Sequence, residues 1–222
     1  QFAALATEGE VLVSADDGQT WTANPIETEE SPQGITCDPQ NRLWVVGSFT
    51  TIIVSGDGGQ NWEDHSIGDD TILTTIQFID AEHAMIFGEY GFSVYTADGG
   101  QTWTPGTPLP DEFYPQDAWF RDLQTGWVAG LAGQILHTAD GGQTWALQNT
   151  GTLAPIYSLA GIGNDVYAAG GEGTLLKLEG DGWRRVDHGQ PVRLFLRVVH
   201  AAGADRVLIG GAAGALDGGP RS

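Results

Sequence analysis

The octad Thr96-Ala-Asp-Gly-Gly-Gln-Thr-Trp103 returns unchanged as Thr138-Ala-Asp-Gly-Gly-Gln-Thr-Trp145. Two close copies precede it, Ser14-Ala-Asp-Asp-Gly-Gln-Thr-Trp21 and Ser55-Gly-Asp-Gly-Gly-Gln-Asn-Trp62. Their tryptophans are 41, 41 and 42 residues apart, and a worn copy, Leu178-Glu-Gly-Asp-Gly-Trp183, follows 38 residues later. A constant period of about 40 residues with Gly-rich turns is typical of the blades of a β-propeller.

Each period divides into four short extended runs. In the second repeat these are residues 34–37, 43–47 and 52–54, and a segment that Trp62 opens. Such runs are rich in β-branched and aromatic residues and are broken by Gly and Asp, which indicates strands rather than helices. We therefore expect an all-β chain whose blades are four-stranded antiparallel sheets.

The length of 222 residues favours a single propeller domain over residues 1–222. Dividing the length by the period predicts about five blades. In a closed five-bladed arrangement, the run 194–199 would supply the innermost strand of the first blade. Alternatively, the chain is part of a larger ring of six or seven blades, which would leave sheet edges exposed.

The octad has a structural logic of its own. An Asp in a tight turn accepts hydrogen bonds from backbone N–H groups just ahead of it, and the following Gly residues tolerate a positive φ. The Ser or Thr hydroxyl can link the turn to a neighbouring strand, and the Trp offers an apolar face for packing between blades. A catalytic or calcium-binding Asp would not be needed once per blade, so we interpret these residues as structural. They are Ser14, Asp16, Gly18, Trp21, Ser55, Asp57, Gly59, Trp62, Thr96, Asp98, Gly100, Trp103, Thr138, Asp140, Gly142 and Trp145.

The composition excludes several functions. The formal net charge is −20, with 29 Asp and Glu against 9 Lys and Arg, which disfavours nucleic acid and anionic lipid as partners. Cys37 is the only cysteine, so a disulfide framework and a cysteine zinc site are excluded. No apolar run approaches the roughly 18 residues of a membrane span. Gln1 is compatible with a mature terminus left after signal-peptide cleavage.

The octad resembles the Asp-box, or BNR, repeat of sialidase-type propellers. The longer pattern Gly126-Trp-Val-Ala-Gly130 followed by Gly133-Gln-Ile-Leu-His-Thr-Ala-Asp-Gly-Gly-Gln-Thr-Trp145, with Phe120-Arg-Asp122 ahead of it, resembles the photosystem II assembly factor Ycf48 family. That resemblance implies a non-catalytic propeller outside the cytoplasm, in the periplasm or an equivalent compartment, that helps to assemble a membrane complex. Photosynthetic members carry an arginine-rich surface, whereas here only Arg42 and Arg121 precede residue 184, so the broader bacterial group fits better.

The end of each blade opposite the octads is formed by inter-blade loops and by the turns between second and third strands. Loops at one end of a rigid scaffold often carry function. Here they combine carboxylates with aromatic side chains, which favours a basic protein partner, since aromatic residues are frequent hot spots. The candidate partner-binding residues are Phe49, Asp69, Asp70, Glu89, Tyr90, Asp111, Glu112, Phe113 and Tyr114. The alternative is a solvated acidic rim that keeps the protein soluble.

Two other functions fit the sequence less well. A glycoside hydrolase or glycan-binding propeller would use paired carboxylates, but Arg42, Arg121 and Arg193 sit at different points of their repeats and match no sialidase motif. The pairs Asp16-Asp17 and Asp69-Asp70 are hard oxygen donors for calcium, yet no Asp-x-Asp-x-Asp-Gly loop is present. We therefore expect no catalytic residues, no cofactor and no metal. The expected partner is a membrane protein or an exporter or assembly complex.

Overall fold

The computed structural model describes residues 2–6, 9–16, 18–26, 28, 30–110, 113–188, 195–203, 206–212 and 214–218. The chain divides into two compact units, Gln1–Asp111 and Glu112–Ser222, and each contains three antiparallel sheets. That residues 1–222 act as one domain remains a prediction. Among the described residues, no helix has the length and apolar character needed to cross a membrane.

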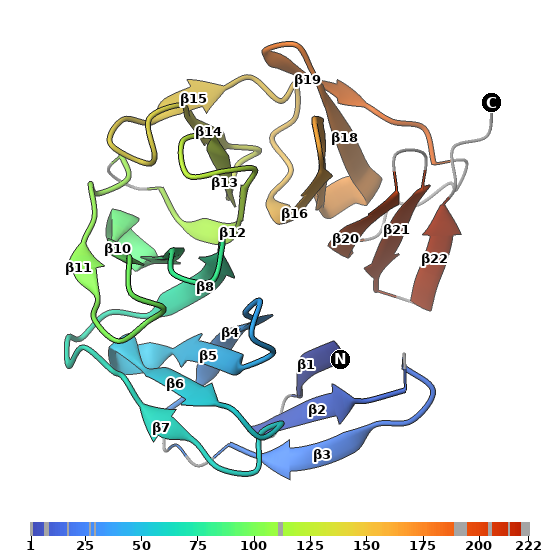
Figure 1. The fold of residues 1–222 in the computed structure, drawn as a ribbon. Helices are drawn as coiled ribbons and strands as arrows, with labels where there is room; N and C mark the ends of the chain where they lie inside the picture. Colours follow the sequence, from blue (N-terminus) through green and yellow to red (C-terminus); the bar gives the residue numbers. More distant parts are fainter. Residues whose placement is uncertain are drawn as a thin grey trace. The chain divides into compact units, whose positions relative to one another are not determined.

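In the first unit, the strands follow one another along the chain within each sheet (Figure 1). The first sheet contains β1 (Phe2–Ala6), β2 (Glu10–Ser14) and β3 (Thr22–Pro25). The second contains β4 (Pro32–Cys37), β5 (Leu43–Gly47), β6 (Ile52–Ser55) and β7 (Glu63–Asp64). The third contains β8 (Leu73–Phe78), β9 (Ala84–Gly88), β10 (Ser93–Thr96) and β11 (Thr104–Pro105).

The second unit repeats this meander in three further sheets. Its first sheet contains β12 (Pro115–Phe120), β13 (Gly126–Gly130), β14 (Ile135–Thr138) and β15 (Ala146–Gln148). The next contains β16 (Ile156–Ile162), β17 (Asp165–Gly170), β18 (Thr174–Glu179) and β19 (Gly182–Arg185). The last contains β20 (Leu196–Gly203), β21 (Arg206–Gly211) and β22 (Gly214–Gly218).

The blade pattern agrees with the sequence. Within the described ranges four sheets have four strands and two have three, which is consistent with about five blades. One detail was wrong: β20 pairs with β21 and opens a sheet of its own, so the run near 194–199 does not serve the first sheet.

Every residue of β5, β9 and β13 is buried, and β5 packs against a neighbouring sheet on each face. In β5, Leu43 and Val45 pack toward β2, whereas Trp44 and Val46 pack toward β8 and β9. Successive side chains of a strand point to opposite faces, so alternate residues of β5 belong to two different hydrophobic cores. It explains why the sequence shows a continuous apolar run here rather than an alternating one.

Two of the octad tryptophans pack between sheets as the sequence predicted, whereas Trp21 is 46 % exposed. Trp62 lies against the core between the first and second sheets, and Trp103 against the core between the second and third. In the second unit, Trp183 of the worn copy packs against Trp127 and Leu176. Each therefore contributes apolar surface to an inter-sheet core.

The first strands share a further feature that the sequence did not reveal. In β4, β8, β12, β16 and β20 the register shifts at the second residue of the strand. Such a β-bulge leaves one residue unpaired and bends the strand. The bulged residues are Gln33, Thr74, Gln116, Tyr157 and Arg197.

Candidate functional site

The octads form closed turns between the third and fourth strands. In the first copy, the Ser14 hydroxyl donates to Asp16 Oδ1 (2.9 Å) and accepts from the Gly18 N–H (2.8 Å). The same Oδ1 atom accepts from the Thr20 N–H (2.8 Å), and Oδ2 accepts from the Thr20 hydroxyl (2.6 Å). The same pattern recurs around Asp57, Asp98 and Asp140.

These contacts hold the octad carboxylates in the ionised form. Hydrogen bonds from the Thr20 hydroxyl, the Thr20 N–H and the Ser14 hydroxyl lower the pKa of Asp16 from 3.8 to about 2. The equivalent bonds from Thr102 and Thr96 lower the pKa of Asp98 to about 2. The pKa values of Asp57 and Asp140 are lowered for the same reason. The structural interpretation of the octads therefore has a direct physical basis.

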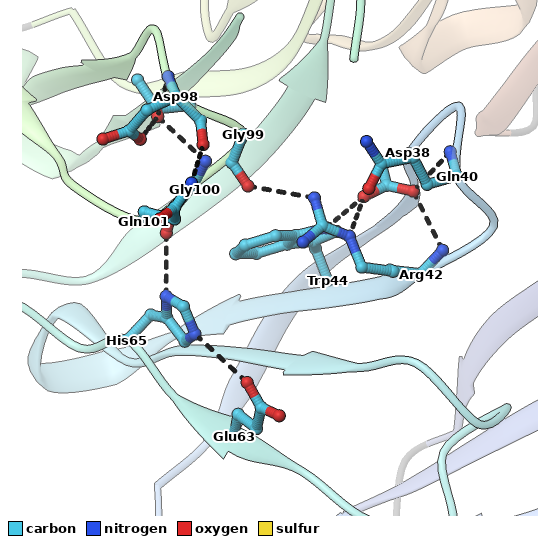
Figure 2. A network of polar contacts seen from close by, with 11 residues as sticks. Asp38, Gln40, Arg42, Trp44, Glu63, His65, Asp98, Gly99, Gly100 and Gln101 are labelled. Atoms are coloured by element: carbon cyan, nitrogen blue, oxygen red, sulfur yellow. Dashed lines mark hydrogen bonds and ion pairs between the residues drawn. The ribbon is translucent and has the colours of Figure 1, made fainter. Parts of the chain in front are cut away.

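A second network at the octad end was missed by sequence reasoning (Figure 2). The buried Asp38 carboxylate accepts from Arg42 Nε (2.6 Å) and from the Trp44 indole (3.0 Å). Arg42 also donates to the Gly99 carbonyl (3.0 Å), which belongs to the octad of the next sheet. The only sequence signal was the spacing Asp-x-x-x-Arg-x-Trp, which carries no known chemistry by itself.

The same network fixes neighbouring sheets to one another. His65 Nδ1 lies 2.8 Å from the Gly100 carbonyl, and Nε2 lies 3.8 Å from Glu63 (Figure 2). A Cβ atom at Gly100 would collide with the Trp44 ring. Burial acts to raise the pKa of Asp38, but the hydrogen bonds from Trp44 and Arg42 outweigh it and lower that pKa. The octad end of the second and third sheets is therefore occupied by structural contacts.

At the opposite end, the turns between second and third strands present aromatic side chains. These turns are the 3-10 segments η1 (Ser48–Thr50) and η2 (Glu89–Gly91). Their central residues adopt left-handed backbone angles, Phe49 at φ 54° and Tyr90 at φ 56°. Phe49 is 56 % exposed and Tyr90 is 85 % exposed. A left-handed conformation costs a non-Gly residue about 1 kcal/mol, so two large aromatics are held outward against a local penalty.

The loop 67–72 joins these two turns. The Thr50 N–H donates to the Thr71 carbonyl (2.8 Å), and the Glu89 N–H donates to the Ile72 carbonyl (2.9 Å). The Thr50 hydroxyl accepts from the Asp69 N–H (2.8 Å), which anchors the acidic part of the loop. The structure thus brings together five of the nine predicted residues. We call Phe49, Asp69, Asp70, Glu89 and Tyr90 the acid–aromatic surface.

The four remaining candidates differ. Asp111 and Glu112 lie outside the described residues. Phe113 is 3 % exposed and its ring packs against Gly130, so it belongs to the interior of the second unit and is not available to a partner. Tyr114 is half-buried.

The described residues contain no group of three or more His, Cys, Asp or Glu placed to hold a metal ion.

Four-stranded sheets whose third and fourth strands are joined by Asp-box turns define a BNR-repeat β-propeller protein. The family model described as photosynthesis system II assembly factor YCF48 matches residues 31–93 and 66–155, which together make up more than half of the chain. The chain belongs to this family. Comparison with curated protein sequences gave no significant match.

Solved structures support the fold. YCF48 bound to D1 peptide is 19 % identical with a TM-score of 0.67, and the match covers 90 % of this chain but only 66 % of that one. YCF48 from Cyanidioschyzon merolae is 18 % identical with a TM-score of 0.72, covering 98 % of this chain and 78 % of that one. An inactive variant of virginiamycin B lyase from Staphylococcus aureus with quinupristin is 12 % identical with a TM-score of 0.73, covering 93 % and 72 %.

Proposed function

We propose that this chain is a non-catalytic assembly factor that works outside the cytoplasm and binds a membrane-protein complex through its acid–aromatic surface. The observation that carries the proposal is the outward display of Phe49 and Tyr90 beside Asp69 and Asp70 on adjoining turns. Family membership supports an assembly role. The location outside the cytoplasm rests on the family resemblance alone.

The chemistry of this surface suits a basic partner segment. Arg42 is the only Lys or Arg among residues 1–111, and it is engaged by Asp38 at the octad end. The acid–aromatic surface therefore has no Lys or Arg from its own unit to neutralise it. Carboxylates attract Lys and Arg side chains, and exposed aromatic faces bind them by cation–π contacts. One relative in this family was solved with a D1 peptide, which supports a polypeptide as the ligand class.

The octads do not offer the chemistry of the alternative, a glycosidase. A glycosidase needs a carboxylic acid with a raised pKa as its proton donor. The octad carboxylates have lowered pKa values, and their oxygens accept hydrogen bonds from groups of the turn. Some proteins with a similar fold are enzymes, among them an ancestral GH74 enzyme at 14 % identity and a TM-score of 0.66. Hydrolysis of chromogenic glycosides by the purified chain would therefore contradict the non-catalytic part of the proposal.

Affinity capture from a detergent extract of the source organism's envelope tests the binding part. We expect a specific membrane protein to be recovered at low salt and weakened at high salt, because exposed charges are screened. The double variant Phe49→Ala, Tyr90→Ala should reduce recovery about tenfold, the size expected when hot-spot side chains are truncated. Reversing the charge at Asp111 and Glu112 tests whether the surface extends into that loop.

The matched control is Tyr95→Ala, which removes an exposed tyrosine from β10 beside the octad of the same sheet. It should leave recovery unchanged. If Asp98→Asn abolishes capture while its melting temperature is unaltered, the partner binds the octad end and the proposed surface is wrong.

A further inference from the structure

Two β-bulges in the second unit bring their side chains into contact. Tyr157 is the bulged residue of β16 and Arg197 is that of β20, and these first strands of neighbouring sheets pack together. The central carbon of the Arg197 guanidinium lies 4.3 Å from the centroid of the Tyr157 ring. A bulge leaves its residue without a ladder partner and redirects the side chain, which accounts for this contact.

Phe195 lies on the same guanidinium. Its ring centroid is 5.6 Å from the Arg197 guanidinium carbon and 6.2 Å from the Tyr157 ring, with an interplanar angle of 65°. The Phe195 carbonyl accepts from the Ala212 N–H (3.1 Å), which fixes the chain just before β20. Two aromatic rings therefore hold the guanidinium by cation–π contacts. We call Tyr157, Phe195 and Arg197 the cation–aromatic cluster.

Arg197 has no carboxylate partner in the part of the chain that the structure describes. Three other described cations, Arg42, Lys177 and Arg184, each form an ion pair with a carboxylate at 2.6 or 2.7 Å. The whole chain has 29 Asp and Glu, and Arg197 is exposed. Its positive charge is therefore available to an anion from outside this chain.

The aromatic contacts leave the hydrogen-bonding edge of the guanidinium usable. The N–H donors of Arg point outward in the guanidinium plane, and their fork matches the two oxygens of a carboxylate. The rings also restrict the Arg197 side chain before a ligand arrives, so less conformational entropy is lost on binding. The cation–aromatic cluster is thus preorganised for a carboxylate.

Exposed apolar surface lies beside the guanidinium. In β20, the two consecutive residues Arg197 and Val198 are exposed between the buried Leu196 and Val199. Val198 is 56 % exposed, and Phe195 is 48 % exposed. Arg and Tyr are enriched among the hot spots of protein interfaces. Apolar side chains next to the cation favour a polypeptide over a small free acid.

We propose that the cation–aromatic cluster binds an Asp or Glu side chain of a polypeptide whose neighbouring apolar side chains cover Phe195 and Val198. One cation matches one carboxylate, whereas nucleic acid and anionic lipid need a cluster of cations. The charge of the second unit is compatible with this, since residues 112–222 contain eight Lys and Arg against 11 Asp and Glu. The inference goes beyond the proposed function, which concerns a basic segment on the first unit.

The test is fluorescence anisotropy with a dye-labelled, end-capped peptide of alternating glutamate and leucine as the probe. At about 0.15 M salt, charges more than about 8 Å apart are largely screened, so the remote carboxylates of the chain do not mask a direct contact. The same peptide with glutamine in place of glutamate should bind about tenfold more weakly, because a hydrogen bond to a charged group is worth more than a neutral one.

Substitutions in the cluster separate charge from geometry. Arg197→Gln should weaken binding of the acidic peptide about tenfold, because the charge-assisted hydrogen bonds are lost. Arg197→Lys should restore only part of the affinity, since it keeps the charge without the planar fork. Tyr157→Phe keeps the ring and should bind normally. The matched control is Arg184→Gln, which removes the same charge from an exposed arginine of the same unit and should leave binding unchanged.

Melting temperatures of the variants, measured alongside, separate a loss of binding from unfolding. The inference is overturned if the acidic peptide does not bind at millimolar concentration, if Arg197→Gln binds it as the natural chain does, or if the glutamine peptide binds equally well. It is also overturned if a glutamine peptide with a free C-terminal carboxylate binds more tightly than the capped acidic peptide, since the carboxylate would then come from a chain end. Because the probe is acidic, its failure leaves capture through the acid–aromatic surface unaffected.

Discussion

The two units share one framework and differ in charge. Residues 1–111 contain 18 Asp and Glu against a single Arg, whereas residues 112–222 contain 11 Asp and Glu against eight Lys and Arg. Both units build their sheets from the same meander and close them with the same Asp-box turns. The framework therefore tolerates very different surfaces, and the charge asymmetry belongs to the loops and edges rather than to the fold.

The turns between second and third strands show this most clearly. Phe49 and Tyr90 in the first unit correspond to Ala132 and Glu172 in the second, and all four have φ between 54° and 56°. The repeat fixes this backbone conformation, since the turn has to connect the same two strands each time. The side chain is free to vary, which is how one scaffold acquires a local binding chemistry.

The largest difference in stability loss between the two units should come from substitutions in the turns between first and second strands. Asp38→Ala removes the acceptor for Arg42 and for the Trp44 indole, and leaves buried donors unpaired. We expect a loss of about 3 kcal/mol in the free energy of unfolding. Chemical denaturation of the purified variant measures it.

The matched variant in the second unit is Asp122→Ala. Asp122 is exposed and accepts from the backbone N–H groups of Gln124 and Thr125 (both 2.8 Å). Its loss should cost about 1 kcal/mol, because water replaces the acceptor. Equal losses of unfolding free energy for the two variants would show that the Asp38 network stabilises the protein no more than an exposed turn does.

Acid should loosen the octad turns of both units, since the pKa of Asp140 in the second unit is also lowered by hydrogen bonds from Thr144 and Thr138. Because the pKa of Asp16 and Asp98 is lowered from 3.8 to about 2, their contribution to stability is complete above pH 4 and is lost as the pH falls toward 2. Melting temperatures measured across this range should fall more steeply for the natural chain than for Asp98→Asn. Parallel curves would show that the carboxylate does not stabilise the turn.

The smallest effect concerns the left-handed turn residues, and it separates stability from binding. Tyr90→Gly and Ala132→Gly should each raise stability by about 0.5 kcal/mol, since Gly adopts positive φ without a steric penalty. Tyr90→Gly should also reduce partner capture, whereas Ala132→Gly should not. If neither or both variants lose capture, the distinction between the two sets of turns is incorrect.

Much of the fold could be predicted because the octads repeat at a fixed period. Each octad places a turn, and the runs on either side of it then have to be strands; the observed β6, β10 and β14 end at the predicted Ser or Thr. Five of the nine partner-binding candidates also meet on adjoining turns, because the repeat puts those turns at one end of the sheets. Phe113 was different: nothing in its local sequence shows that it packs beneath Gly130.

The sequence by itself determined the all-β class, the approximate number of blades and the Asp-box turns, because the octad hydrogen bonds lie within four residues of chain and the octads recur at a fixed period. The tertiary structure decided what depends on packing between distant segments: the bond from Arg42 to Gly99, the burial of Phe113 and the orientation of Gln148 between Trp127 and Trp183. Local hydrogen bonds are encoded in local sequence. Contacts over 20 or more residues depend on how whole sheets stack, and a single side chain does not reveal them.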